Sequence, residues 1–533
     1  MKSTKKLLAL LLSAILLLSL LPAAFATEAG AGESAGGEAT SSTAQKFHLT
    51  ITDTYPKHVF ELYQVFTGTL HTETTQVGGT ETTTRYLSDI AFGSAWTNTT
   101  GKDISTIVDE FKKNVDNNWN VLVTENVATP TVYKTQTCAA GATSVTFSDL
   151  PAGYYIAREI TPAADMGEGV TYSSVIVQVV ESVNVASKHG TASSQKKVKD
   201  TNDSVANSTT GWQDSADYDI GDMVPFQLTA MVGSDYAKYS KERGYSLTFH
   251  DHESKGLTFD STTVNAYVVN GNENPVTIAT SEYKVSPLTT RTDGSHDFTI
   301  QFTNLKNIEA VQAGSKIVVE YKSRLNEDAV IGSTGNPNEM YIKFSNNPNS
   351  DTHEEGGKTP VDKVIVFTFE MDVLKYDGTG NTEAVPLAGA EFTLEKMVNG
   401  KYEVIKTIGS DKAADWGGVN ALFRFSGLDD GEYRLSETKT PRGYNTAKPV
   451  EFTITATHSE VADEPILIDL NCTGDGITVN QNKQIHATVY NYRGNTLPST
   501  GGMGTTVFYV LGSILAVGAA ILLVSKKRMN GAR

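Results

Sequence analysis

Short runs in which apolar and polar residues alternate recur through most of this chain. They include KFHLTIT, SSVIVQVV, SKIVVEYK, VIVFTFEMDVLKYD and HATVYNY, and Gly, Asn, Asp and Pro separate them. Because side chains alternate across a strand, such runs bury one face against a core, and many short runs of this kind are typical of β-sandwiches. We therefore predict a mainly β protein made of tandem immunoglobulin-like sandwiches.

One segment follows a helical period instead of a strand period. Five apolar residues between 104 and 115 share one helical face: Ile104, Ile107, Val108, Phe111 and Val115. A short amphipathic helix is therefore expected in the first domain. Stretches rich in small and polar residues at 186–195 and 346–360 are interpreted as linkers. They divide the chain into an N-terminal domain at 46–187, a middle domain at 190–358 and a C-terminal domain at 363–494.

Both ends of the chain carry export and membrane signals. Residues 1–26 combine a basic start, a long apolar run and the small-x-small site Ala24-Phe25-Ala26, which is typical of a secretory signal peptide. Residues 27–45 lack large apolar side chains and are expected to form a flexible leader. Residues 505–524 are uncharged and long enough to span a bilayer as a helix, and the tail at 525–533 is basic, which places it in the cytoplasm.

Charge and cysteine content exclude several classes of function. The formal net charge of −17 disfavours nucleic acid as a partner. The exported region has two distant cysteines, Cys138 and Cys472, so we expect no disulfide framework. The ten histidines are scattered, and His250 and His252, which flank Asp251, alternate across a strand. The sequence therefore predicts no metal site, no cofactor and no enzyme active site.

Three strands of the third domain end with a polar residue on the face that should be buried. Lys375 follows Met371 and Val373 in FEMDVLKYD, Glu437 follows Tyr433 and Leu435 in YRLSE, and Asn491 follows Val489 in ATVYN. A single residue of this kind would usually be an edge residue or a strand end that lifts into solvent. Three residues with complementary chemistry, an amine, a carboxylic acid and a carboxamide, are harder to explain in that way.

Long motifs of this sequence resemble those of Gram-positive sortase-assembled pilins. PLAGAEFTLEK, FSGLDDGEYRLSETKTPRGY and VYNYRGNTLPSTGG resemble their C-terminal SpaA or Cna-B-type domain. SADYDIGDMVPFQLTA, FHDHESKGLTF and YIKFSNNPN resemble their isopeptide-forming middle domain. FELYQVFTGTL and YLSDIAFGSAW resemble the N-terminal domain more loosely. The resemblance covers nearly all of the exported chain and implies Cna-type sandwiches.

The resemblance also implies spontaneous Lys–Asn isopeptide bonds, each promoted by a nearby acid. Carried over to this chain, the third-domain set is Lys375, Asn491 and Glu437, and the middle-domain set is Lys196, Asn346 and Asp251. Lys197 and Asn347, one residue away, remain alternatives. We also consider a third set in the first domain, consisting of Lys46, Glu159 and Asn184. The bonds would replace disulfides as covalent staples.

The segment Leu497-Pro498-Ser499-Thr500-Gly501 matches the Leu-Pro-x-Thr-Gly sorting signal of sortase substrates. The resemblance implies cleavage between Thr500 and Gly501 by a sortase and transfer of the Thr500 carbonyl to an amine. Lys188, in SSVIVQVVESVNVASKHG, is the candidate acceptor, although the Trp and Tyr-Pro of the usual acceptor motif are absent.

Sortase, neighbouring subunits and peptidoglycan are thus the implied partners, and a host surface ligand is a further candidate partner. We interpret the chain as a shaft subunit of a cell-surface pilus. The alternative is a minor tip or base pilin, or a monomeric wall-anchored adhesin.

Overall fold

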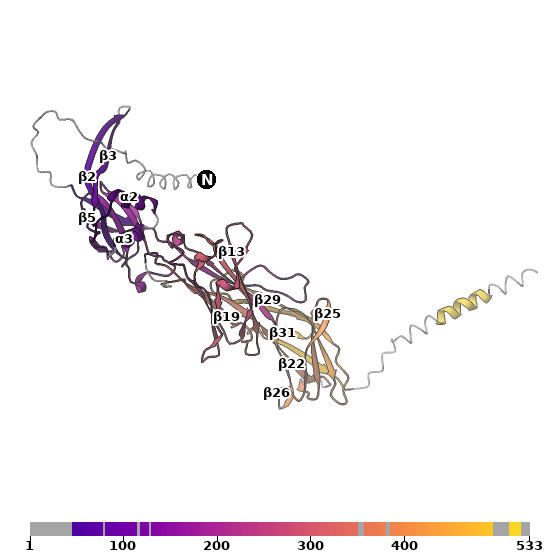
Figure 1. Cartoon of the computed structure of the whole chain (residues 1–533). Coiled ribbons are helices and arrows are strands. Elements are labelled where there is room, and N and C mark those ends of the chain that lie inside the picture. Colours follow the sequence, from indigo (N-terminus) through magenta and orange to yellow (C-terminus); the bar gives the residue numbers. More distant parts are fainter. Residues whose placement is uncertain are drawn as a thin grey trace, which may run out of the picture.

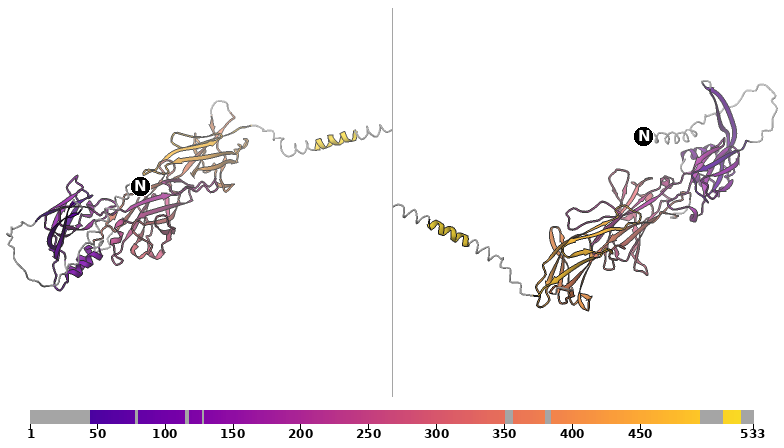
Figure 2. Two further views of the ribbon diagram at one scale, coloured as in Figure 1. Left: turned by 90° about the horizontal axis from the view of Figure 1, so that it is seen from above. Right: turned by 180° about the vertical axis from the view of Figure 1, so that it is seen from behind.

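Three β-rich units follow one another along an elongated molecule (Figure 1; Figure 2). The computed structural model describes residues 45–77, 80–114, 118–126, 129–349, 356–379, 384–493 and 511–523. The predicted signal peptide, the sorting signal, the basic tail and most of the leader lie outside these residues. The prediction of a mainly β protein of tandem sandwiches is confirmed.

The first domain combines a small sheet with a larger one. The small sheet has the order β5 (Val145–Leu150), β1 (Phe47–Thr52), β8 (Val183–Ala186). The larger sheet has the order β3 (Thr80–Phe92), β2 (Val59–Val77), β6 (Gly153–Glu159), β7 (Ser174–Val179), and β4 (Lys134–Thr137) pairs with β2. The β2–β3 hairpin extends beyond the body of the domain (Figure 1). Leu49, Ile51, Phe60 and Phe147 pack between the two sheets.

Two helices form a second, smaller core on the larger sheet of this domain. α2 (Ile104–Lys113) confirms the predicted helix, and Asp103 caps it by accepting a hydrogen bond from the backbone N–H of Thr106 at 3.0 Å. α3 (Asn118–Asn126) was not predicted, because its apolar residues do not repeat at a helical period. Phe111 of α2 and Trp119 of α3 are buried there together with Ile156 of β6.

The middle domain packs two sheets face to face. One has the order β14-β13-β18-β11-β9, with bounds Val276–Thr277, Leu257–Val269, Lys316–Leu325, Met223–Met231 and Ser193–Val198. The other has the order β10-β21-β19-β12-β17-β15, with bounds Ser215–Asp217, Asp362–Phe367, Asn336–Phe344, Leu247–Glu253, His296–Phe302 and Lys284–Val285. β16 (Thr289–Thr290) pairs with β17, and β20 (Gly357–Lys358) pairs with β19.

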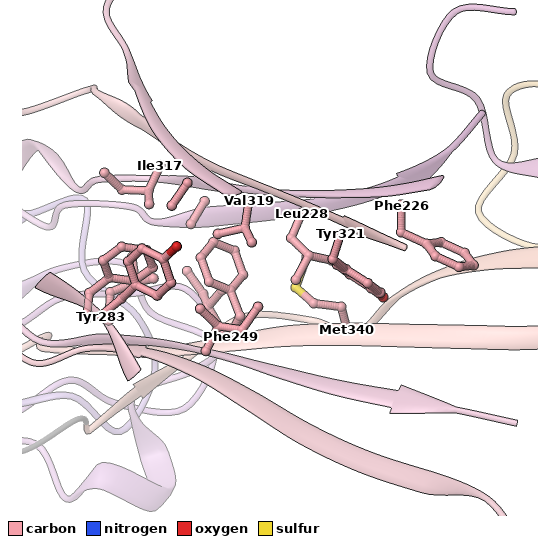
Figure 3. Packing of buried hydrophobic residues seen from close by; sticks show 14 of the residues in the cluster. Phe226, Leu228, Phe249, Tyr283, Ile317, Val319, Tyr321 and Met340 are labelled. Carbon is pink, nitrogen blue, oxygen red and sulfur yellow. The ribbon is translucent and has the colours of Figure 1, made fainter. Parts of the chain in front are cut away.

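Aromatic side chains fill the space between these two sheets. Phe226, Tyr321 and Met340 lie at one end of the core residues drawn in Figure 3, and the rings of Phe226 and Tyr321 stack at 5.4 Å. Burying an aromatic side chain removes a large apolar area from water and stabilises the sandwich. Tyr321 also carries a hydroxyl group into this interior, where it requires polar partners.

The third domain is a second complete sandwich. One sheet has the order β26-β27-β22-β32-β31, with bounds Ala414–Trp416, Val419–Leu428, Phe369–Asp377, Ile485–Asn491 and Ile477–Val479, and β23 (Val385–Pro386) pairs with β22. The other has the order β25-β24-β28-β29-β30, with bounds Lys401–Gly409, Glu391–Val398, Gly431–Lys439, Val450–His458 and Leu467–Gly474. β22 and β32 come from opposite ends of the domain, yet they are parallel neighbours.

The boundary between the middle and third domains differs from the expected one. β21 pairs with β19 and β10 in the middle sheet, so residues 362–367 belong to the middle domain and the third begins with β22. The described part of the predicted linker 346–360 includes β20, which pairs within the same sheet. Composition alone suggested a linker here, but a polar stretch can equally be a loop that returns to its own sheet.

Within the described residues, four 3-10 turns occur at Ala163–Asp165, Ser234–Lys238, Thr280–Glu282 and Leu305–Asn307. Residues 511–523, inside the expected span 505–524, are helical. None of the helices within the described ranges has the length and apolar character needed to cross a membrane.

A buried lysine joins the middle and third domains. Lys396 of β24 has no exposed surface, and its amine donates to Asp219 of the middle domain at 2.6 Å and to Asp429 at 2.5 Å. Burial would lower the pKa of Lys396, but the carboxylates of Asp429 and Asp219 raise it above its ordinary value. The joint is therefore held by an ion pair between the two domains.

We expect Lys396→Met to loosen this joint. The change leaves Asp219 and Asp429 without their cation, which typically costs about 3–5 kcal/mol for a buried pair. Differential scanning calorimetry should show a lower unfolding temperature for the third domain. Lys406→Met, at an exposed position on the neighbouring strand β25, is the matched control and should leave the transition unchanged. An unaltered transition in Lys396→Met would contradict the role of the ion pair.

Candidate cross-linking sites and the sorting signal

The structure brings together the three polar residues predicted in the third domain. Lys375 on β22 and Asn491 on β32 lie on neighbouring parallel strands, where Lys375 pairs with Val489 and Asp377 with Asn491. Glu437 enters from β28 of the facing sheet. All three residues are buried, with exposed fractions of 0%, 1% and 7% for Lys375, Asn491 and Glu437. They lie at or near the C-terminal ends of their strands.

The carboxylate of Glu437 lies between the amine and the carboxamide. Lys375 Nζ is 4.0 Å from Glu437 Oε1, and Asn491 Nδ2 donates to Glu437 Oε2 at 2.9 Å. The backbone N–H of Ala447 also donates to Oε2, at 2.7 Å. Among the described residues, neither Glu437 Oε1 nor Asn491 Oδ1 has a hydrogen-bond partner. Because unpaired buried polar atoms are rare, this group is poised for a further interaction or reaction.

Burial makes the amine of this cluster more nucleophilic. It lowers the pKa of Lys375 to about 8, although Glu437 and Asp377 act in the opposite direction. At neutral pH roughly a tenth of such amines is uncharged, compared with well under a thousandth for an ordinary lysine. The Lys375 amine also donates to the Val489 carbonyl at 3.2 Å, which holds it beside β32. A neutral amine next to a carboxamide and an acid can form an amide.

The middle domain contains a second buried lysine, and it is Lys196 rather than Lys197. Lys196 Nζ lies 2.5 Å from Asp251 Oδ2 and 2.9 Å from the Tyr321 hydroxyl, and neither Lys196 nor Asp251 has exposed side-chain surface. Lys197 points to the other face of β9 and pairs with Asp214. The structure therefore brings together two of the three residues predicted for this site.

Asn346 lies elsewhere. In the β12–β19 pairing, Asp251 is opposite Met340, and Asn346 follows Met340 by six residues, roughly 20 Å of extended chain. The side-chain amide of Asn346 donates to the Val170 carbonyl of the first domain at 3.3 Å. The backbone carbonyl of Asn346 accepts a hydrogen bond from the backbone N–H of Tyr172. Asn347 follows it and is only partly buried. The structure thus places Asn346 at the joint with the first domain, away from Lys196.

Asn338 occupies the position expected for the carboxamide. It is fully buried on β19, and its Nδ2 donates to the Tyr321 hydroxyl at 3.0 Å and to Glu253 at 3.2 Å. Since Lys196 contacts the same hydroxyl, both side chains lie in one pocket. Asn338 Oδ1 and Asp251 Oδ1 have no hydrogen-bond partner among the described residues. Sequence reasoning missed Asn338 because it shares its strand face with Asn346, and alternation alone does not distinguish the two.

Burial shifts the pKa values of the amine and the two acids in this pocket toward their uncharged forms. Burial lowers the pKa of Lys196 and raises the pKa of Asp251 above its ordinary value. Glu253, also fully buried, has a pKa raised to about 8 by burial and by the neighbouring Asp251. Both directions favour an uncharged amine beside a protonated acid, the state needed for amide formation.

The third set considered, in the first domain, is not assembled. Lys46 and Asn184 are exposed, whereas Glu159 is buried beside His58 and His189.

The predicted acceptor Lys188 is exposed after β8, and its backbone N–H donates to Ser173 Oγ at 2.8 Å. The sorting signal Leu497, Pro498, Ser499, Thr500 and Gly501 lies outside the described residues.

Family models match three parts of the chain. Residues 370–464 match the SpaA prealbumin-like fold domain, and residues 220–348 match the Cna-B-like domain of Gram-positive pilin backbone subunit 2. Residues 491–531 match the LPXTG cell wall anchor motif. The chain belongs to the Gram-positive pilins. It is a sortase-anchored, cell-wall-linked pilus subunit, and this family is structural rather than enzymatic.

One curated protein and several solved structures are similar to this chain. The pilin is 24% identical over 407 residues to the trypsin-resistant surface T6 protein of Streptococcus pyogenes serotype M6, covering 62% of this chain and 68% of that protein. The solved structure of the T6 backbone pilin matches with a TM-score of 0.50 and 17% identity, over 85% of this chain and all of that one. The major pilin SpaD of Corynebacterium diphtheriae matches with a TM-score of 0.45 and 16% identity, over 86% and 100%.

Proposed function

We propose that this pilin is a polymerising shaft subunit, stiffened by two isopeptide bonds that it forms itself, Lys375–Asn491 and Lys196–Asn338. The observation that carries the proposal is the buried cluster in the third domain. There an amine with a lowered pKa and a carboxamide, on the first and last strands of a sandwich, both lie beside the carboxylate of Glu437.

In the third domain the reaction exchanges one amide for another. Lys375 Nζ attacks the side-chain carbonyl carbon of Asn491, the C–Nδ2 bond breaks and ammonia leaves. Glu437 is suited to carry the proton, because Oε1 faces the lysine amine and Oε2 contacts the departing nitrogen. It takes the proton that Lys375 loses and returns it to the leaving group. No other reactant is required.

In the middle domain the same exchange would join Lys196 to Asn338. Asp251 Oδ2, 2.5 Å from the Lys196 amine, takes the ammonium proton and leaves the amine neutral, and the Tyr321 hydroxyl lies between the lysine and the carboxamide. Glu253 contacts Asn338 Nδ2 and is suited to pass the proton that the attacking amine loses to the departing nitrogen, which leaves as ammonia. The role of promoting acid, predicted for Asp251, would thus be shared by two carboxyl groups on β12.

Polymerisation would use the sorting signal and Lys188. A sortase cysteine attacks the Thr500 carbonyl, the Thr500–Gly501 bond breaks, and Thr500 is held as a thioester. The amine of Lys188 on another subunit then displaces the thiol and forms an amide. Lys188 suits this role because its backbone is fixed by Ser173 while its side chain is exposed. Attachment of the last subunit to peptidoglycan follows the same chemistry with a different amine.

Peptide mapping tests the middle-domain bond and the choice of asparagine. We expect a digest of the denatured full chain to contain a branched peptide that joins Lys196 to Asn338 and is lighter than its two parts by one ammonia. Asn338→Ala should abolish it and lower the unfolding free energy by about 4–5 kcal/mol, the range for cross-links that close long loops. Asn346→Ala is the matched control and should retain the branched peptide. The opposite result for the two variants would refute Asn338 as partner.

A conservative change tests the acid of the third domain. Glu437→Gln preserves the shape of the side chain but cannot carry the proton, so we expect Lys375 and Asn491 to remain in separate peptides. Glu432→Gln, at an exposed position on the same strand, should leave the Lys375–Asn491 peptide intact. Formation of the bond at an undiminished yield in Glu437→Gln would remove Glu437 from the mechanism.

Cell-wall extracts test the shaft assignment. On a denaturing gel we expect a ladder of very large species that survive boiling, and Lys188→Ala should collapse it to monomer. Lys57→Ala, a nearby lysine with a 74% exposed side chain, is the control and should preserve the ladder. A single monomer-sized band from the unaltered protein would favour a monomeric adhesin, and a ladder that persists in Lys188→Ala would assign the acceptor role to another lysine.

A further inference from the structure

The first domain buries a polar group that neither cross-link uses. His58 lies just before β2, Glu159 ends β6, and His189 follows β8. The side chains of His58, Glu159 and His189 are 2%, 0% and 7% exposed. Both histidines face the same carboxylate, and their rings approach edge to face at 5.5 Å between centroids. Such a group needs a chemical reason to be buried.

The hydrogen bonds around His189 determine which of its nitrogens carries a proton. The Ser187 hydroxyl donates its single hydrogen to the Asp53 carbonyl at 2.6 Å, so its oxygen must accept from His189 Nδ1 at 2.8 Å. In a neutral ring Nε2 then carries only a lone pair. That atom faces Glu159 Oε2 at 2.8 Å. Two acceptors face each other unless a second proton or a metal cation lies between them.

His58 also directs a ring nitrogen at Glu159 without an aligned hydrogen bond between them. Its Nδ1 lies against Glu159 Oε1, yet it makes no aligned hydrogen bond and is a buried atom without a hydrogen-bond partner among the described residues. Glu159 Oε1 already accepts from the Thr161 hydroxyl at 2.8 Å, and Oε2 from the Ser173 backbone N–H at 2.8 Å. The carboxylate is therefore held in place by donors other than the two histidines, and both ring nitrogens are directed at it.

We propose that His58, Glu159 and His189 form a binding site for a divalent transition metal, with zinc as the best chemical match. Two imidazoles and one carboxylate are a recurrent zinc ligand set, completed by water. One donor atom from each residue lies within 4.8 Å of the others, and donors around a tetrahedral zinc are roughly 3.3 Å apart, so small side-chain rotations suffice. Ser187 would be the outer partner that fixes the metal-binding nitrogen of His189.

Two other clusters of acidic side chains are also close enough to hold a metal ion, but each already contains a cationic side chain. Asp203, Asp219, Asp222 and Asp429 are close enough to hold an ion, but the Lys396 amine lies among them. His458 lies between Asp200 and Asp217, and although burial opposes it, hydrogen bonds to these two carboxylates raise its pKa to about 10. In both groups the protein supplies its own cation. Around Glu159 the two histidine nitrogens are the only basic side-chain atoms in the described contacts.

The position of the site suggests what the metal would do. Ser187 and His189 flank Lys188, and the next residue, Gly190, donates to the Thr171 hydroxyl at 2.6 Å beside the strand that enters the middle domain. A metal bound through His189 would fix this segment to β6 and to the loop before β2, leaving the Lys188 side chain exposed. This consequence for polymerisation rests on the proposed acceptor role of Lys188, whereas the metal site itself does not.

Metal titration of the full chain, purified in detergent and stripped with a chelator, tests the site. We expect one equivalent of Co²⁺ to bind with the intense visible absorption of a four-coordinate ion, and Zn²⁺ to displace it. Zn²⁺ should also raise the unfolding temperature of the first domain. His189→Gln and His58→Gln should each lose the absorption. His71→Gln, in the same domain, is the matched control and should keep it, because His71 is hydrogen-bonded to Ser88 and stacked on Tyr86, away from Glu159.

Three outcomes would overturn the proposal. The first is the absence of four-coordinate absorption in the unaltered protein. The second is equal absorption in the unaltered protein and in both histidine variants. The third is an unfolding temperature of the first domain that depends on pH but not on Zn²⁺, which would mean that a second proton on His189 fills the place of the metal. Because metal binding is read without a sortase, none of these outcomes depends on whether Lys188 is the acceptor.

Discussion

The burial of a lysine amine inside a sandwich core is the constraint on which the rest of this pilin depends. Taking a charged amine out of water costs several kcal/mol, and Lys375 and Lys196 have no exposed surface. Burial favours the neutral amine, which is also the reactive form. An amide bond would then remove the charge permanently. Folding thus creates the reactive group, and reaction would make the folded arrangement irreversible.

Lys396 shows that burial alone does not determine this outcome. It is as fully buried as the other two lysines, but its neighbours are the carboxylates of Asp219 and Asp429, which keep the amine charged. At Lys375 and Lys196 a carboxamide lies next to a single contacting acid. The number of carboxylates in direct contact with the amine therefore separates an ion pair that joins two domains from a site that can form a covalent bond.

Strand alternation predicted the polar faces from the sequence, but it could not predict positions along a strand. Lys375, Glu437 and Asn491 meet because each lies at or near the C-terminal end of its own strand and the three strand ends come together in the fold. Asn338 and Asn346 share a face of β19 and its extension, and only the pairing of β19 with β12 shows which one is near Asp251. Glu159 follows His58 by about a hundred residues and His189 follows Glu159 by 30, so no local pattern could connect them. The sequence also did not predict that β21 belongs to the middle sheet, because strand pairing rather than composition determines its sheet.

The proposed bonds would shorten the path along which the shaft carries tension. A pull applied between Lys188 and Thr500 would run from Lys188 to Lys196, cross to Asn338, follow β21 and β22 to Lys375, and cross again to Asn491. Residues 197–337 and 376–490 would then bear no load, and neither would the first domain, which precedes Lys188. Because β21 belongs to the middle sheet while β22 begins the third, the segment between the two bonds is also the connection between the domains. Lys396 and its aspartates lie beside that connection, so the ion pair would resist bending while the covalent path resists stretching.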